Sequence, residues 1–336
     1  MRLSKAGTTG CKRPRSRKGS GASLLPISSL HKLASKSWEF DRVFRPGASN
    51  EDVFREVEGL VTSVLDGYNV CIFAYGQTGS GKTYTMEGSR ESPGVNFRTL
   101  DALFALRAER APDCARCDIS ISLLEIYNEA IRDLMAPHAK GAEPAELKIR
   151  DVGTVSVPGL TLRAVHSRED VTAAMQAAYR NRTTFATNMN EHSSRSHCVL
   201  SVHVESVSRV TGAASRGRLH LVDLAGSERV GRSGATGDRL KEAQAINKSL
   251  SALGDVIAAR AEKKAHVPFR NSTLTHLLSE SLSGDSKTLM FVNASPIMCD
   301  SEETFCSLNF AQRVRTVELG VARRHVEAGA AAVGGH

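Results

Sequence analysis

A glycine-rich stretch of eight residues carries the clearest chemical signal in the sequence. It consists of Gly76, Gln77, Thr78, Gly79, Ser80, Gly81, Lys82 and Thr83, and it matches the pattern GxxxxGK[ST] in full. Glycines let successive backbone N–H groups curve around phosphate oxygens, and a following helix adds positive potential at its N-terminus. Lys82 would reach the β- and γ-phosphates of a nucleotide, and the Thr83 hydroxyl would ligate Mg²⁺. The stretch predicts a phosphate-binding loop, with a glycine-rich surface turn as the alternative.

A second candidate element begins at Asp223, directly after the apolar stretch 219–222. A carboxylate at the end of a buried strand can hold Mg²⁺ through water, and the backbone N–H of Gly226 can donate to a γ-phosphate. The DxxG pattern formed by Asp223 and Gly226 is by itself weak evidence for a nucleotide-binding segment. After an apolar strand, in a chain with a phosphate loop, it predicts a nucleotide-sensing segment over residues 223–228.

A polar loop over residues 190–197, with the sequence NEHSSRSH, is the third candidate element. Its three hydroxyls and its arginine suit Mg²⁺ ligation and a charge clamp, although an ordinary polar loop is the alternative. The nucleotide is expected to be ATP. A guanine-specific protein would normally carry an NKxD motif, whereas the stretch from Asn247 to Leu250 reads NKSL and lacks the aspartate.

The elements that must position these residues alternate between strand and helix patterns. Strands are expected at 38–44, 70–75, 119–127, 199–207, 219–223 and 289–293, and helices at 50–65, 168–180, 240–259 and 303–319. Residues 70–75 are apolar throughout, which is typical of a strand buried on both faces. The alternation predicts an α/β fold of the P-loop NTPase class, with a central mixed, mainly parallel sheet flanked by helices on both faces.

Charge, hydropathy and cysteine usage give no support for nucleic-acid binding, a membrane span or a cysteine metal site. The net charge is +8 over 336 residues, but nine of the lysines and arginines lie within residues 1–36, so the rest is nearly neutral and gives no argument for nucleic acid. No apolar run approaches the ~18–20 residues that span a bilayer, and no secretory signal is seen. Cys114 and Cys117 form one CxxC pair without a second, so structural or free thiols are expected over a metal or redox role.

The motifs together resemble one family, the kinesin motor domains. FAYGQTGSGKTYTMEG, NEHSSRSH, LVDLAGSE, INKSLSALGDVIAA, HVPFRNSTLTHLL and SGDSKTLMFVNASP follow one another in the order of that family. The resemblance covers roughly residues 37–320. The stretch EETFCSLNFAQRVRTVELG is most similar to kinesins that carry the motor at the C-terminus. The resemblance implies a microtubule-stimulated ATPase that uses ATP and Mg²⁺ and moves along microtubules, with minus-end direction as the weaker implication.

The resemblance also implies roles for single residues. Tyr84 would pack against adenine. Ser194 would join Thr83 and Asp223 at Mg²⁺, and Arg195 would pair with Glu228 to close the site around the attacking water. The implied catalytic set is Lys82, Asn190, Ser194, Arg195, Gly226 and Glu228. The long helix near residue 240 would lie on the microtubule, with Arg239, Lys241, Lys248, His266 and Arg270 as candidate contacts to the acidic tubulin surface.

Two departures from the family pattern stand out. Thr273 occupies the place of a lysine, which removes one positive charge from the candidate patch. No arginine-rich strand precedes residue 37, so the first strand of the sheet is expected to be missing, with a basic disordered tail over 1–29, a motor domain over 30–320 and a short Ala/Gly-rich tail over 321–336. The departures leave open a microtubule-binding module with impaired ATP turnover, because the missing strand would help to bind adenine.

The resemblance to kinesin motor domains also implies a binding partner and a cellular location. Microtubules are the expected partner, with no membrane span. Without a heptad pattern the chain is expected to be monomeric as given, and to dimerise only through a coiled coil that it does not contain. The stalk and neck of a C-terminal motor are absent as well as the first strand, so we expect either a fragment or misassigned start of a longer protein, or a true loss of the strand. We expect a cytoplasmic, microtubule-associated location; the basic run at 12–18 could serve nuclear entry or be a solvated tail.

Overall fold

The computed structural model describes residues 2–6, 36–137, 146–184, 194–229 and 237–328. Ten of the described strands form one sheet, with the order β2-β1-β11-β3-β10-β9-β4-β5 and with β8 and β12 at its margins. Their bounds are β1 Arg2–Ala6, β2 Arg42–Phe44, β3 Asn69–Tyr75, β4 Cys114–Tyr127, β5 Ala130–Asp133, β8 Arg163–Val165, β9 Ser196–Ser208, β10 Ala214–Asp223, β11 Ser286–Val292 and β12 Val326–Glu327. The short strands β6 (Arg150–Asp151) and β7 (Val155–Ser156) form a separate hairpin.

The sheet is mixed, as expected, but it is not mainly parallel. The pairs that join β2, β1, β11, β3 and β10 are parallel. Every pair on the other side of β10, from β10 with β9 to β4 with β5, is antiparallel, and so are the pairs made by β8 and β12. On the antiparallel side β4 is followed directly by β5, and β9 by β10, whereas helices lie in the chain between β2 and β3 and between β10 and β11 on the parallel side.

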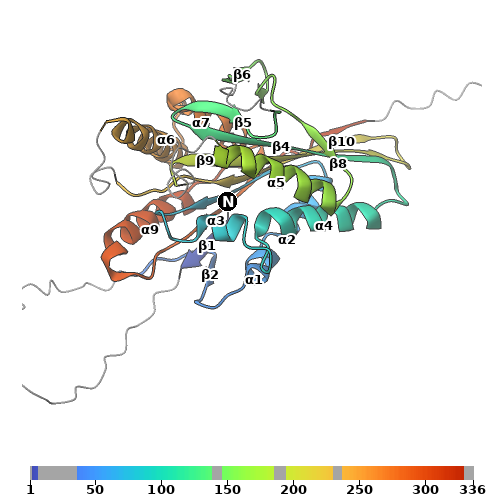
Figure 1. The fold of residues 1–336 in the computed structure, drawn as a ribbon. Helices are drawn as coiled ribbons and strands as arrows, with labels where there is room; N and C mark the ends of the chain where they lie inside the picture. The colour runs from blue at the N-terminus through green and yellow to red at the C-terminus, as the bar shows by residue number, and fades with distance from the viewer. Residues whose placement is uncertain (1, 7–35, 138–145, 185–193, 230–236, 329–336) are drawn as a thin grey trace, which may run out of the picture.

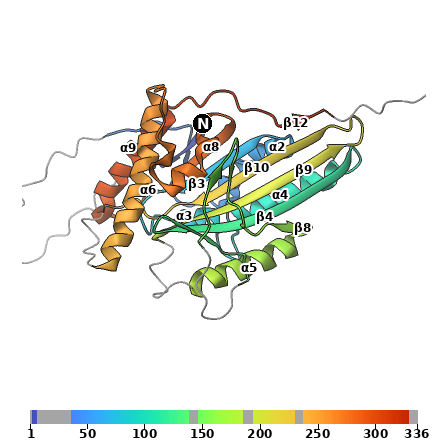
Figure 2. The same ribbon diagram turned by 90° about the horizontal axis from the view of Figure 1, so that it is seen from above.

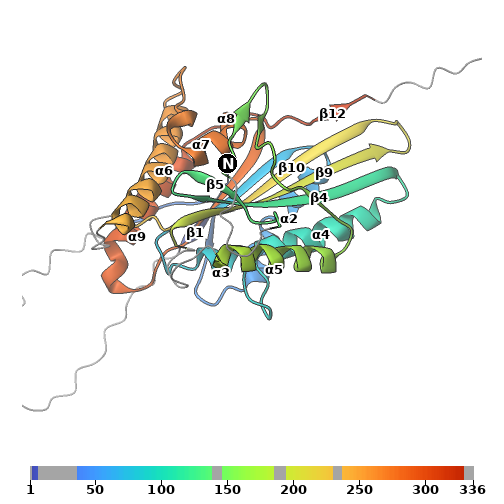
Figure 3. The ribbon, with the colours of Figure 1, turned by 45° about the horizontal axis from the view of Figure 1, so that its top comes forward.

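Helices cover both faces of the sheet (Figures 1 and 3). One face packs against α1 (Asn50–Arg55), α2 (Glu58–Leu65), α4 (Val95–Glu109) and α5 (Arg168–Thr184). The other packs against α6 (Asp238–Ala261), α7 (Thr273–Leu277), α8 (Ser279–Ser283) and α9 (Ser301–Arg315). Figure 2 shows α6 and α9 at one end of the long strands β4, β9 and β10. No helix among the described residues has the length and apolar character that a membrane span requires.

Strand β3 shows why the sheet is sandwiched in this way. Its alternate residues Val70, Ile72 and Ala74 belong to the core under α2 and α4, while Cys71 and Phe73 belong to the core under α6 and α9. All five are fully buried. Because successive side chains of a strand point to opposite faces, an unbroken apolar run needs a helical layer on each side, and the fold provides both.

Two helices differ from the sequence-based expectation. The helix expected over residues 50–65 is divided into α1 and α2 at Glu56 and Val57, and a capping box between Ser49 and Asp52 begins α1. Helix α4 was not predicted. It buries Val95, Leu100 and Leu103 against the sheet and α2, and these few apolar residues are diluted by polar and alanine positions.

The first strand, expected to be missing, is present in the structure. Strand β1 lies between β11 and β2 and runs parallel to both, with Arg2 opposite Leu289 and Ser4 opposite Arg42. The expectations of a missing strand and of a structureless tail over residues 1–29 are therefore wrong for residues 2–6. Five residues give too short a pattern to recognise, and strand pairing can be made by backbone groups alone.

The segment after α9 returns along the sheet. We call residues 317–328 the C-terminal strap. His325 N donates to Gly67 O at 2.8 Å, Arg216 N donates to His325 O at 3.0 Å, and β12 pairs with the start of β10. The part of the expected 321–336 tail that the structure describes thus belongs to the fold.

One close approach in the sheet gives a stability prediction. A Cβ atom on Gly217 of β10 would lie 1.9 Å from the carbonyl oxygen of Val64 in α2, so Gly217→Ala must push helix and sheet apart. We expect it to lower the free energy of unfolding by about 2 kcal/mol or more, measured by chemical denaturation. The control is Gly254→Ala in α6, whose added Cβ would meet only Phe310 at 3.8 Å. That change should be neutral or raise stability by up to about 1 kcal/mol; equal effects of the two changes would contradict the prediction.

Candidate functional site

The phosphate-binding loop connects β3 to the short helix α3 (Lys82–Met86). Glycine is required at two of its positions. A Cβ on Gly76 would lie 2.2 Å from the carbonyl oxygen of Asn293, where the loop passes the end of β11, and Gly81 has φ of 94° directly before α3. The loop therefore lies between the carboxyl ends of the parallel strands β3 and β11.

Lys82 lies inside this loop rather than in solvent. Its side chain is buried, and Nζ donates to the carbonyl oxygen of Gln77 at 2.9 Å. Burial lowers the pKa of Lys82, while the carboxylates of Asp223 and Glu228 oppose that shift. An ammonium group held in this way is directed at the space that the loop backbone encloses, and a phosphate group is a stronger acceptor than the carbonyl it contacts now.

Thr83 and Asp223 meet at the floor of the loop and fit a magnesium ion. Thr83 Oγ1 donates to Asp223 Oδ2 at 2.6 Å. The other carboxylate oxygen of Asp223 is buried and has no hydrogen-bond partner among the described residues. Burial raises the pKa of Asp223, against the effects of Thr83 and Lys82. A hydroxyl and a buried oxygen that lacks a donor form the kind of site that a hydrated divalent cation satisfies.

The segment after β10 contacts both other candidate elements. Gly226 N donates to the carbonyl oxygen of Ser194 at 2.9 Å, so the amide expected to face a γ-phosphate is engaged with the polar loop here. Glu228 accepts from Thr78 N at 2.8 Å and from Thr78 Oγ1 at 2.5 Å. The three motifs found in the sequence are thus brought together in one place. Asn190 lies outside the described residues.

The expected salt bridge between Arg195 and Glu228 is not the one that the structure shows. Arg195 Nη1 donates to Glu242 Oε2, on α6, at 2.8 Å. Both oxygens of Glu228 face Thr78 instead. The expectation came from the sequence alone, which does not specify in which nucleotide state the two side chains meet.

His197 connects the site to α6. It is buried, its Nδ1 accepts from the backbone N–H of Ala225 at 3.0 Å, and its Nε2 lies 2.7 Å from Ser249 Oγ of α6. A ring nitrogen that accepts from a backbone amide carries no proton, so the ring is neutral with its proton on Nε2. Burial, with Lys82 nearby, lowers the pKa of His197 to about 3.

A buried charge cluster behind the site was not found from the sequence. Arg182, near the end of α5, pairs with Glu125 of β4 at 3.0 Å, and Ser196 Oγ donates to the same Glu125 oxygen at 2.6 Å. Glu87, after α3, lies 3.8 Å from Arg182, and burial raises its pKa to about 7. The cluster joins the end of the phosphate-loop helix to the start of β9. The one signal that could have found it is the position of Arg182, eight residues before the polar loop.

The candidate microtubule contacts lie on or beside α6. Arg239 and Lys241 are in its first turn, and Lys241 and His266 are exposed. Two of the cations have acidic partners: Lys248 lies 3.6 Å from Glu129, and Arg270 lies 2.9 Å from Asp151. The side chain of Arg239 is outside the described residues. The patch is thus less positive than the sequence suggested.

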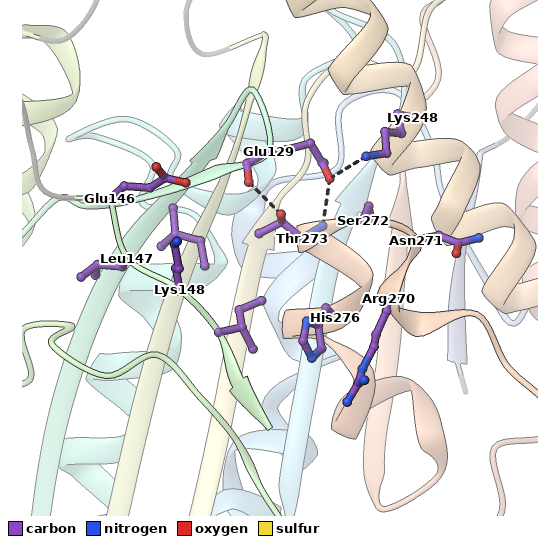
Figure 4. A pocket seen from close by; sticks show the side chains of 12 residues that line it. Glu129, Glu146, Leu147, Lys148, Lys248, Arg270, Asn271, Ser272, Thr273 and His276 are labelled. Atoms are coloured by element: carbon purple, nitrogen blue, oxygen red, sulfur yellow. Dashed lines mark hydrogen bonds and ion pairs between the residues drawn. The ribbon is translucent and has the colours of Figure 1, made fainter. Parts of the chain in front are cut away.

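Thr273, which stands in the place of the family lysine, forms hydrogen bonds with Glu129, the partner of Lys248. Its N–H donates to Glu129 Oε2 at 3.1 Å and its Oγ1 donates to Glu129 O at 2.7 Å (Figure 4). Glu129, Lys248 and Thr273 line one side of a 270 Å³ pocket, with Arg270 and His276 on the other. Thr273 therefore contributes hydrogen bonds to Glu129 where the family lysine would contribute a positive charge. Lys248 is then the cation that pairs with Glu129.

Tyr84 on α3 is 54% exposed, so its ring is accessible for stacking on a base. The described residues contain no group of three His, Cys, Asp or Glu side chains that could hold a metal, and Cys114 and Cys117 are free thiols.

A phosphate loop between strand and helix, a magnesium-type hydroxyl and carboxylate pair, and a sensing segment after the neighbouring parallel strand define a P-loop nucleotide-binding protein. Comparison with known proteins gives the family. The family description "Kinesin motor domain" matches residues 18–317. The chain therefore belongs to the kinesin motor domain family, as its motifs implied. Strand β1 lies outside the matched range.

Relatives and solved structures agree with this assignment. The kinesin-like protein KIN-14R of Arabidopsis thaliana is 53% identical over 296 residues, which are 88% of this chain but only 27% of the plant protein. KIN-14R of Oryza sativa subsp. japonica is 53% identical over 302 residues, 89% of this chain and 30% of the rice protein. The Saccharomyces cerevisiae Kar3 motor domain is 45% identical with a TM-score of 0.72, and the match covers 82% of this chain and 83% of that one. A KIF14 dimer in complex with a microtubule is 38% identical with a TM-score of 0.78, over 85% and 84% of the two chains. The chain thus spans less than a third of the length of these two plant relatives.

The neutral state of His197 gives a prediction about pH. Its pKa is lower in the folded chain than the ~6.5 of an exposed histidine, so the unfolded state binds more protons and stability falls as pH drops below about 6.5. Between pH 7.5 and 5.5 His197 should cost about 1 kcal/mol of the free energy of unfolding, measured by denaturant titration. In His197→Asn, whose amide oxygen can accept from Ala225, the decrease should be smaller by that amount. An identical decrease in both proteins would contradict the assignment of a neutral, buried ring.

Proposed function

We propose that this chain is a microtubule-stimulated ATPase, a motor domain that converts ATP hydrolysis into movement along microtubules. The observation that carries the proposal is the junction of Lys82, Thr83 and Asp223, with an unpartnered carboxylate oxygen, beneath the phosphate loop. The family assignment supports ATP as the nucleotide.

Each residue has a role in this proposal. The loop N–H groups and Lys82 bind the phosphates, and Tyr84 stacks on adenine. Thr83 and Ser194 would hold Mg²⁺ directly and Asp223 would hold it through water; the ion would supply positive charge to the phosphates. Catalysis is then positioning and charge stabilisation, since no covalent nucleophile is needed.

The sensing segment responds to the γ-phosphate. The Gly226 N–H would leave the Ser194 carbonyl for a phosphate oxygen, and Glu228 would leave Thr78 for Arg195, while Asn190 helps to place the attacking water. The Gly226 and Glu228 contacts seen here would belong to a state in which the site is open. Their release and re-formation would couple the phosphate to the polar loop.

The microtubule contacts are proposed for the surface of α6 and its surroundings: Arg239, Lys241, Lys248, His266 and Arg270. The microtubule in the KIF14 complex supports this partner. The pairing of Lys248 with Glu129 and of Arg270 with Asp151 lowers the positive charge of the patch, so the shape of the surface would contribute to binding as well as its charge.

The direction of movement and the oligomeric state are further parts of the proposal. Similarity to the KIN-14 proteins and to Kar3 favours a C-terminal motor with minus-end direction, dimerised through a coiled coil outside this chain. We propose a cytoplasmic, microtubule-bound location, with nuclear entry through the basic run at residues 12–18 as a further option.

Steady-state ATP hydrolysis by the purified chain, with and without microtubules, tests the proposal. Turnover should rise with microtubules, and Lys82→Ala should lower it by about 100-fold or more, because the charge that stabilises the transferred phosphate is lost. The control is Lys264→Ala, an exposed cation after α6, which should turn over ATP like the unchanged chain.

The alternative is a microtubule-binding module with impaired turnover. The reason for this alternative was the expected loss of a strand that helps to bind adenine, and the presence of β1 weakens that reason. Cosedimentation of the folded chain with microtubules, without any hydrolysis, would decide for this alternative and against the active motor.

A further inference from the structure

Arg195 stands between two acidic side chains that lie on different elements. It directly precedes Ser196, the first residue of β9, which pairs with Tyr127 of β4, so its backbone is joined to the sheet at one end. Glu242 lies on α6, and Arg195 Nη1 donates to it at 2.8 Å. Glu228, the other acid, follows β10 and is occupied by Thr78. A move of Arg195 to Glu228 therefore breaks contacts on both sides.

Glu242 is itself held in place. Its Oε1 accepts a short hydrogen bond from the hydroxyl of Tyr127, the last residue of β4, while Oε2 accepts from Arg195. The guanidinium of Arg132 lies 4.6 Å from the centre of the Tyr127 ring. Burial and the Glu242 carboxylate raise the pKa of Tyr127 to about 12, so the phenol remains a donor at neutral pH. Both oxygens of Glu242 thus accept from side chains at the ends of strands, Tyr127 at the end of β4 and Arg195 directly before β9.

The pair is partly shielded from water and depends on the position of α6. The side chains of Arg195 and Glu242 are 23% and 21% exposed, so their attraction is less screened than that of a surface pair. A second contact between α6 and β9 lies two turns further along the helix, where Ser249 Oγ meets His197. Because His197 lies in β9 and Arg195 directly precedes that strand, displacement of α6 changes both contacts together.

We propose that Glu242 is a positioning residue that holds Arg195 on α6, oriented by Tyr127, and thereby keeps Arg195 away from Glu228 until α6 moves. This inference rests on the proposed function, in which the pair of Arg195 and Glu228 closes the site. Glu242 and Glu228 then compete for one guanidinium. A surface that displaces α6 releases Arg195 to Glu228, which links track binding to hydrolysis through a single exchange of ion-pair partner.

Single-turnover and steady-state hydrolysis of Glu242→Gln tests the competition. The glutamine keeps the size and loses the charge. Without microtubules the hydrolysis rate should rise about two- to fivefold, the size expected for loss of a partly exposed ion pair, with KM for ATP unchanged. The fold stimulation by microtubules should fall by a similar factor. Tyr127→Phe, which only removes the hydroxyl, should change the rate in the same direction by less.

The control is Asp255→Asn, which removes an equal charge from an exposed position of the same helix. It should leave the microtubule-free rate unchanged. If Glu242→Gln and Tyr127→Phe both behave like this control while the unchanged chain hydrolyses ATP normally, the inference is overturned and the proposed function stands. If the unchanged chain does not hydrolyse ATP at all, the proposed function fails and the inference with it.

Discussion

The structure depends on charges buried at the carboxyl ends of β3 and β10. An isolated buried ammonium or carboxylate would cost several kcal/mol, so each must find a partner within the fold. Lys82 uses a loop carbonyl and the field of Asp223, and Asp223 uses Thr83. These partners coincide only if β3 and β10 are adjacent, parallel and in register, and the pairing of Ala74 with Asp223 provides this. The sheet order is thus the condition for the site.

The same arrangement makes the site sensitive to elements beyond it. The segment after Asp223 contacts the phosphate loop through Glu228, the polar loop through Gly226, and α6 through Ala225 and His197. Few of these contacts are apolar. Directional hydrogen bonds fix geometry within a few tenths of an ångström, so a change at the phosphates alters angles and distances along the whole segment. The strands are held by the sheet, so under the proposed function such changes would reach α6 through the contact of His197 with Ser249.

Local chemistry could be predicted from the sequence, and long-range pairing could not. The motifs at residues 76–83 and 223–228 could be recognised because the groups that would contact a nucleotide lie within a few residues of one another. Strand β3 could be predicted from its unbroken apolar run. The partner of Arg195 is 47 residues away, and that of Arg182 is 57 residues away. Nothing in the local pattern distinguishes Glu242 from Glu228 as an acceptor. Likewise, the neutralisation of Lys248 by Glu129 and of Arg270 by Asp151 arises only when the chain folds. Helix α4 was missed because its apolar stripe is thin, and β1 because it is short.

The C-terminal strap has a mechanical consequence. Its first residues Val317 and Leu319 are buried in the core. Further along, it is held by a short pairing with β10, by backbone hydrogen bonds at Gly67 and Arg216, by the ion pair of Arg216 with Glu327 at 2.9 Å, and by contacts of Arg323 with Asp285 and of Arg324 with Asp66. Its described end lies beside the start of β10, at the end of the long strands opposite α6 (Figure 2). Tension applied there by an optical trap or a tethered bead would act first on the start of β10, because β12 and Glu327 are bonded to that strand, and would then break the strap's bonds one after another toward residue 317. Attachment through the strap would therefore behave as a compliant coupling, whereas a handle placed on the sheet itself would transmit force stiffly.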